Sequence, residues 1–142
     1  MSQAAHAFEV ARVLLVDDDP TSRLTLKTVL EASGYSVDSA ASAAEAVGKL
    51  DQGQYELVLS DLQMESPQAG LKVLAHAKMM DYKPATAIIT AYQDSARTAP
   101  TRKASSVLIR PENVPALLAK IADLLGQRAS RRIERELRLA GA

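Results

Sequence analysis

Cysteine is absent from this chain, so neither a disulfide nor a thiolate nucleophile or metal ligand can form within it. No apolar stretch approaches the roughly 18 residues that a membrane-spanning helix needs, and the first nine residues lack the apolar core of a signal peptide. Acidic and basic residues balance at 17 each, which gives no overall charge that would favour nucleic acid or a membrane surface. We therefore expect a cytoplasmic protein that contacts neither nucleic acid nor membrane directly.

The length and composition fit one globular domain with a tail of different character. The chain has 142 residues, of which 47% are apolar, and this is enough for a sizeable core. After Gly126 there are five arginines and only two glutamates. We expect a lead-in at residues 1–10, a domain at 11–126 and an Arg-rich helical extension or linker at 127–142. A narrow apolar stripe could pack this extension on a partner helix or a second copy of the chain. The stripe consists of Ile133, Leu137 and Ala140.

Four short apolar runs each end in polar residues of the kind that a phosphate or metal site uses. The runs and the residues that follow them are 13–16 with Asp17 and Asp18, 57–60 with Asp61, 87–89 with Thr90, and 107–109 with Arg110. Helix-like segments separate the runs, which is typical of parallel strands covered on both faces. A less apolar stretch at 35–40 is expected to form a further strand at an edge of the sheet.

Helix signals lie between the expected strands. Pro20 can begin a helix because its missing N–H is not needed in the first turn, and Gly34 suits the residue after the helix end. Ser42 and Glu45 have the spacing of a capping box, which predicts that a second helix begins there. A third helix is expected at about residues 71–80.

The second half of the chain completes the alternation of strands and helices. The strongest apolar period in the sequence predicts a helix over 114–125. The segment at 93–104 is expected to hold only a short or irregular helix, because Pro100 lies inside it. The pattern predicts an α/β fold, a flavodoxin-like doubly wound (βα)5 domain with a five-stranded parallel sheet in the order 2-1-3-4-5. The first and last helices should cover one face and the other three the opposite face.

The polar residues at the strand ends should meet. Ligands of open parallel sheets bind at the carboxyl ends of the strands, where the strand order reverses. Asp17, Asp18, Asp61, Thr90 and Arg110 are therefore expected in one crevice. Carboxylates so close together repel one another, and a divalent cation with oxygen ligands would offset their charge.

In the order of these residues the chain resembles response-regulator receiver domains of two-component signalling. The segments that carry the resemblance are VDDDP at 16–20, LVLSDLQM at 57–64 and IITAY at 88–92, within a likeness that covers about residues 10–126. The resemblance implies a signalling protein rather than a conventional enzyme. It also implies phosphoryl transfer from a sensor histidine kinase or a phosphotransfer protein, which would modulate protein–protein interactions.

The resemblance also implies the roles of the site residues. Asp61 would be the phosphoacceptor, since a carboxylate can attack a phosphoryl group to give an acyl phosphate. Asp18 and Asp61 would bind Mg²⁺ directly, Asp17 through a water molecule, and the backbone carbonyl of Gln63 would complete the ligand set. Thr90 would donate a hydrogen bond to a phosphoryl oxygen.

Several residues depart from the family pattern. Arg110 stands where the family has lysine, and a guanidinium is longer and more planar than an ammonium. Val107 replaces the aromatic residue that often rotates as a signal, and Glu65 follows Met64 where the family often has proline. The three aspartates expected to bind the metal thus match the family. Arg110 and Val107, at the positions that take part in the family's conformational switch, do not. The family's pair of a basic residue and proline is present as Arg110 and Pro111, and the resemblance therefore also implies a cis peptide bond between these two residues.

Two other functions fit parts of the sequence. The departures are compatible with a receiver-like module that mediates protein interactions without phosphorylation. In addition, Asp17 and Asp19 with Thr21 fit the Asp-x-Asp-x-Thr motif of haloacid-dehalogenase-type phosphatases, in which Asp17 would be the nucleophile and Asp19 the acid/base. No output domain follows residue 142, so the sequence suggests either a stand-alone receiver or a piece cut within a linker helix.

Overall fold

The computed structural model describes residues 10–62, 64–89, 107–109 and 114–141. The strands are β1 (Arg12–Val16), β2 (Ser36–Ala40), β3 (Leu57–Asp61), β4 (Ala85–Ile89) and β5 (Val107–Ile109). The helices of the described residues are α2 (Pro20–Ala32), α3 (Ala43–Gln52), α4 (Ala69–Lys78) and α6 (Val114–Gly141). The segment at 93–104, where a short helix was expected, and the Arg110–Pro111 peptide lie outside the described residues.

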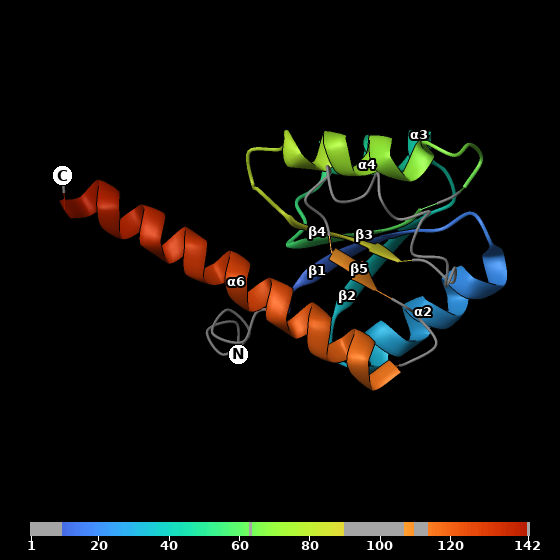
Figure 1. Cartoon of the computed structure of the whole chain (residues 1–142), viewed down its shortest axis with the longest axis horizontal. Coiled ribbons are helices and arrows are strands. Elements are labelled where there is room, and N and C mark those ends of the chain that lie inside the picture. The colour runs from blue at the N-terminus through green and yellow to red at the C-terminus, as the bar shows by residue number, and fades with distance from the viewer. Residues whose placement is uncertain (1–9, 63, 90–106, 110–113, 142) are drawn as a thin grey trace.

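The strands form one parallel sheet in the order β2-β1-β3-β4-β5. Helices α2 and α6 cover one face, and α3 and α4 cover the other (Figure 1). The doubly wound parallel α/β fold predicted from the sequence is confirmed. The reversal of strand order between β1 and β3 creates a crevice at the carboxyl ends of these two strands.

The strands separate two cores because successive side chains point to opposite faces. Val13 and Leu15 of β1 belong to the cluster that packs on α2 and α6, whereas Leu14 and Val16 belong to the cluster under α3 and α4. All four side chains are fully buried. This explains why the central strands have continuous apolar sequences rather than an alternating pattern.

Helix boundaries follow the local signals. Asp19 caps α2 by accepting a hydrogen bond of 2.8 Å from the backbone N–H of Ser22, and Gly34 adopts a positive φ of 102° after the helix. Ser42 accepts from the N–H of Glu45, whose carboxylate in turn accepts from the N–H of Ala41, so the expected capping box forms with a shift of one residue on its return bond.

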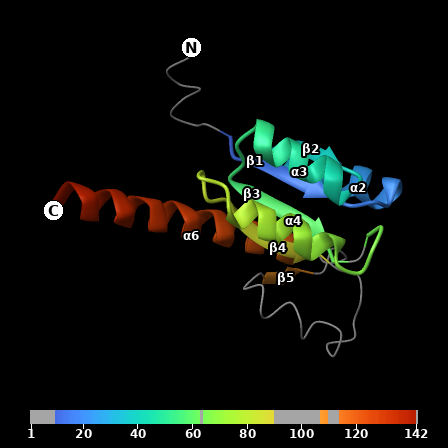
Figure 2. The same cartoon turned by 90° about the horizontal axis from the view of Figure 1, so that it is seen from above.

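Helix α6 continues through Gly126 without a break and runs to Gly141, well past the sheet (Figures 1 and 2). Its buried residues are Leu117, Ile121 and Leu124, as the apolar period predicted, and every described residue from position 129 onward is exposed. None of the described helices is long and apolar enough to cross a membrane.

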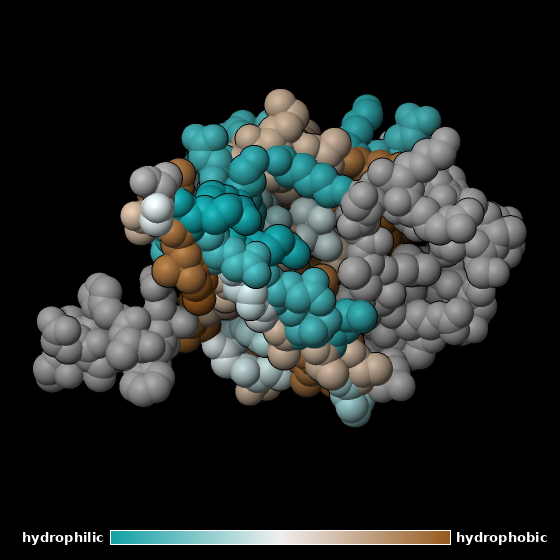
Figure 3. All heavy atoms as spheres, turned by 60° about the vertical axis from the view of Figure 1, so that its left-hand side comes forward, coloured by the Kyte–Doolittle hydropathy of each residue, from teal (hydrophilic) through white to brown (hydrophobic). Residues whose placement is uncertain are grey.

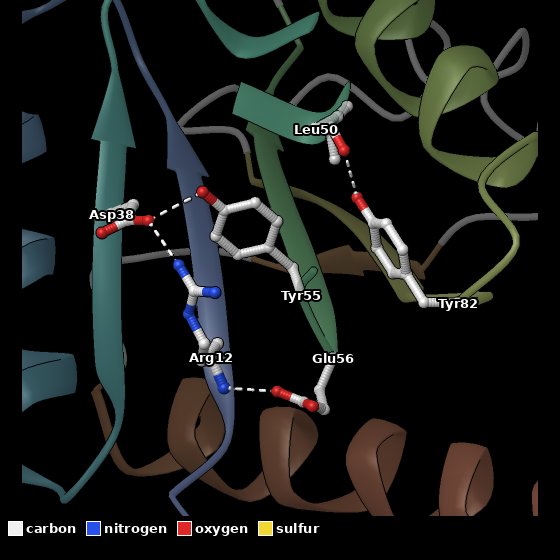
Figure 4. A network of polar contacts seen from close by, with 6 residues as sticks. All are labelled: Arg12, Asp38, Leu50, Tyr55, Glu56 and Tyr82. Carbon is white, nitrogen blue, oxygen red and sulfur yellow. Dashed lines mark hydrogen bonds and ion pairs between the residues drawn. The ribbon is translucent and has the colours of Figure 1, made fainter. Parts of the chain in front are cut away.

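A polar network ties together β1, β2 and the segment that enters β3 (Figure 4). The side chain of Arg12 pairs with Asp38 at 2.9 Å and lies over the ring of Tyr55, whose hydroxyl donates to the same carboxylate at 2.7 Å. The hydrogen bond from Tyr55, with the nearby charge of Arg12, lowers the pKa of Asp38. Burial, together with the bond to Asp38, raises the pKa of Tyr55. Glu56 fixes the start of β1 by accepting from the N–H of Arg12.

Candidate functional site

Three carboxylates meet at the carboxyl edge of the sheet. Asp17 and Asp18 follow β1, and Asp61 ends the neighbouring strand β3, with Val16 paired to Ser60 across the two strands. One carboxylate oxygen from each aspartate lies within 4.8 Å of the others. Asp17 is buried, Asp61 is half-buried and Asp18 is exposed, so the group opens to solvent on one side. The convergence expected from the strand ends is therefore present for all three aspartates.

Asp17 is held by its backbone as well as by its side chain. Its N–H donates to the carbonyl of Ala40 at 3.0 Å, which extends the pairing of β1 and β2. Its carboxylate accepts from the N–H of Asp19 at 3.0 Å. Arg23 of α2 donates to the backbone carbonyl of Asp17 at 2.8 Å and places a cation beside the acidic group. Sequence reasoning missed Arg23, because an arginine on the first helix normally lies in solvent.

Asp61 is positioned by close backbone contacts. The next residue, Leu62, donates its N–H to the carbonyl of Ile89 at 3.2 Å, so β3 stays attached to β4 past the aspartate. Gly70 packs directly behind this turn, where a Cβ would lie only 2.2 Å from the carbonyl oxygen of Asp61. Only glycine allows this approach. Helix α4 begins at Ala69, two residues before the expected start.

Glu65 links the loop after β3 to the beginning of α3. Its carboxylate accepts a hydrogen bond of 3.0 Å from the N–H of Ala43, at the beginning of α3. A helix N-terminus stabilises a negative charge, because its first N–H groups lack intrahelical partners. The substitution of the family's usual proline is thus accommodated by a link between two loops at the carboxyl edge.

The three carboxylates fit a small divalent cation. They supply hard oxygen donors from two adjacent strands, and the exposed side would leave room for the water ligands that Mg²⁺ retains. The other expected participants, Gln63, Thr90 and Arg110, lie outside the described residues. His76 of α4 pairs with Asp51 of α3 at 2.8 Å, which makes it a structural contact between two helices.

Comparison with known proteins identifies the family. The model of the response regulator receiver domain matches residues 13–122, and the chain belongs to this family. The resemblance read from the strand-end motifs is therefore confirmed. The family places the chain in two-component signalling and does not favour the phosphatase alternative.

This chain spans about a quarter of the length of the first curated relatives that it matches. It is 35% identical over 127 residues to the transcriptional regulatory protein GlrR of Escherichia coli, a match that covers 88% of this chain and 28% of GlrR. It is 33% identical over 128 residues to the gliding motility regulatory protein of Myxococcus xanthus, with 85% of this chain and 16% of that protein covered.

Solved structures agree in fold. A CheY-like receiver domain from Methanospirillum hungatei has a TM-score of 0.77 and 27% identity, over 87% of this chain and 99% of that one. The response regulator TrrA of Thermotoga maritima, solved in complex with Mg²⁺ and BeF, has a TM-score of 0.71 and 30% identity, over 81% of this chain and 99% of that one.

Proposed function

We propose that this domain accepts a phosphoryl group on Asp61 in a reaction that depends on Mg²⁺, with a histidine kinase or phosphotransfer protein as donor. The convergence of Asp17, Asp18 and Asp61 in a receiver-family chain is the observation that supports it most strongly. Asp18 and Asp61 would hold Mg²⁺ directly, and Asp17, buried and oriented by Asp19, would hold it through water. The bound ion would offset the negative charge of both the carboxylates and the incoming phosphoryl group.

In the transfer, the carboxylate of Asp61 is the nucleophile and must be aimed at the phosphorus atom. An oxygen of Asp61 attacks phosphorus, the bond from phosphorus to the donor's histidine nitrogen breaks, and that nitrogen keeps the electron pair. Gly70 and the continued pairing of β3 with β4 fix the backbone from which Asp61 is aimed. Thr90 and Arg110 would contact the transferred group, as their places after β4 and β5 suggest.

The test is phosphorylation of the purified chain by acetyl phosphate, read by intact mass. With Mg²⁺ the wild type should gain one phosphoryl group, and Asp61→Asn should gain none. Asp18→Ala should react at least tenfold more slowly and need more Mg²⁺. Asp123→Asn is the matched control, because Asp123 is an exposed carboxylate on α6 that accepts a hydrogen bond from Gln127 of the same helix. If Asp61→Asn is modified as well as the wild type, Asp61 is not the acceptor. If the wild type is never modified, the domain is a phosphorylation-independent interaction module.

We further propose that phosphorylation changes the interactions of α6 with other proteins, and that homodimer formation through this helix is one such interaction. Val107 has no ring to rotate, whereas Ile133 and Leu137 are 56% and 65% exposed on the extension. Self-association of the wild type and of Ile133→Gln/Leu137→Gln should be compared by light scattering, with and without acetyl phosphate. Leu24→Gln is the control, because this α2 leucine is 66% exposed as well. Equal association of all three proteins would make the extension an ordinary solvated helix.

A further inference from the structure

A cleft of about 490 Å³ lies at the amino-terminal edge of the sheet, opposite the aspartates. Its walls are the segment before β3, the segment between α4 and β4, and two turns of α6 beyond the sheet. Figure 3 shows hydrophilic side chains gathered over the side of the molecule from which the end of α6 projects. The volume is within the range of about 300–1,000 Å³ that is typical of small-molecule sites.

The cleft is strongly cationic, although the chain as a whole has no net charge. Among the described residues of its lining, only Glu56 and Asp81 supply negative charge, and the carboxylate of Glu56 is already bonded to the N–H of Arg12. Six basic side chains of these described residues line it, namely Lys78, Lys83, Arg128, Arg131, Arg132 and Arg135.

Most of these cations lack a protein counter-ion. Within the described part of the chain, Lys78, Lys83, Arg131 and Arg135 form no ion pair, and Arg132 has only a loose pair of 3.7 Å with Glu136. The spacing of the arginines places their side chains on one face of α6. Like charges held together in this way repel one another unless an anion lies between them.

Arg128 holds two walls of the cleft together. Its guanidinium donates to the carbonyls of Tyr82 and Lys83 at 2.7 and 2.9 Å, which fastens α6 to the segment that enters β4. Burial lowers the pKa of Arg128, because its direct partners are neutral carbonyls that compensate its charge only partly. Lys83 has a positive φ of 49°, a conformation that favours glycine or asparagine, yet the position holds a lysine whose side chain lines the cleft.

We propose that this cleft binds a small polyanion with several phosphoryl groups, of the size of a nucleoside triphosphate. Arginine forks pair with phosphate oxygens through two parallel hydrogen bonds, and lysine adds a compact charge. The volume of the cleft matches a small molecule, and its basic side chains come from three segments that converge on it, which favours a small ligand over a contact spread along a macromolecule. The site is separate from Asp61 and does not depend on the function proposed for that residue. A bound anion would join α6 to the sheet edge at the point where the helix leaves the domain.

The test is calorimetric titration of the full chain in EDTA, so that metal chelation at the aspartates plays no part. The probes are ATP, inorganic triphosphate and adenosine. Both phosphorylated probes should bind and adenosine should not; tighter binding of ATP than of triphosphate would identify a nucleotide as the source of the phosphates. Arg131→Gln/Arg135→Gln should weaken binding at least tenfold. Lys83→Gly, which keeps the backbone conformation and removes the ammonium, should weaken it several-fold.

Two control variants separate a built site from general charge. Lys120→Gln/Arg138→Gln removes two exposed cations of the same helix that lie outside the cleft, and it should bind as the wild type does. Asp61→Asn should also bind normally. The proposal is wrong if neither phosphorylated probe binds at millimolar concentration, or if the control pair weakens binding as much as the cleft pair. It is equally wrong if duplex DNA or anionic vesicles bind through these arginines while triphosphate does not, because the surface would then serve a macromolecule.

Discussion

Replacing Gly70 by alanine should damage both stability and the acidic site. The new Cβ would lie 2.2 Å from the carbonyl oxygen of Asp61 and 2.9 Å from that of Leu62, whereas carbon–oxygen contacts normally measure about 3.3–3.6 Å. Both obstacles are backbone atoms, so no flexible side chain can move aside, and α4 and β3 must separate by about 1 Å to restore normal contacts.

The expected loss follows from two opposing effects. Overpacking of a core typically costs about 1–3 kcal/mol and occasionally more, while alanine in a helix gains about 0.5–1 kcal/mol over glycine. Because the clash is with rigid backbone, we expect Gly70→Ala to lower the free energy of unfolding by about 2 kcal/mol. At roughly 2–4 °C per kcal/mol for a chain of this size, Tm should fall by about 4–8 °C.

Urea denaturation followed by far-UV circular dichroism measures this change, since the chain has no tryptophan. Gly48→Ala in α3 is the matched control, because nothing lies within 4 Å of its added Cβ, and it should stabilise the protein by about 0.5–1 kcal/mol. Gly70→Ala should also lose Mg²⁺-dependent phosphorylation by on the order of tenfold or more, since a shift of about 1 Å misaims Asp61. Unchanged stability, or a gain like that of Gly48→Ala, would refute the packing argument. Normal phosphorylation in a destabilised variant would refute the positioning argument.

Three smaller changes test other parts of the structure. Tyr55→Phe removes a hydrogen bond to a carboxylate and should destabilise by about 1–2 kcal/mol at pH 7. Because the folded pKa of Asp38 is lowered, the stability that this bond contributes is present above the unfolded pKa of about 4 and should fade as pH falls further, so urea titrations of both proteins should converge in acid. Ser42→Ala removes the cap of α3 and should cost about 1 kcal/mol in the same assay, and a loss below 0.3 kcal/mol would show that Glu45 suffices. Asp19→Asn keeps the cap of α2 and should leave both stability and phosphorylation by acetyl phosphate nearly unchanged, whereas the phosphatase alternative requires this carboxyl group.

The architecture was predictable because its signals are local and repeated. Continuous apolar strands, Pro20 at a helix start and Gly34 after a helix end each indicate one element, and the rules for parallel sheets then bring Asp17, Asp18 and Asp61 to one edge. The supports of the site were not predictable in this way. The contact of Gly70 with the carbonyl of Asp61 depends on how closely a helix approaches a strand, and no sequence period reports that distance.

The cationic cleft shows most clearly what sequence reasoning misses. The sequence predicts an Arg-rich helical extension or linker after Gly126, and a run of charges of this kind is ordinarily a solvated face of a helix. In the folded chain these arginines instead line a cleft, because α6 does not stop at Gly126. Its next turns lie beside Tyr82 and Lys83, which are more than 40 residues away in the chain. Neither the lysines before β4 nor the arginines of α6 indicate a site alone, because each group by itself would simply be solvated by water. The continuation of α6 past the sheet and the hydrogen bonds of Arg128 bring the two groups together, and a guanidinium bound to two carbonyls leaves no trace in sequence periodicity. The density of unpaired cations in the cleft is therefore a property of the folded chain, and the binding experiments on Lys83, Arg131 and Arg135 address that property directly.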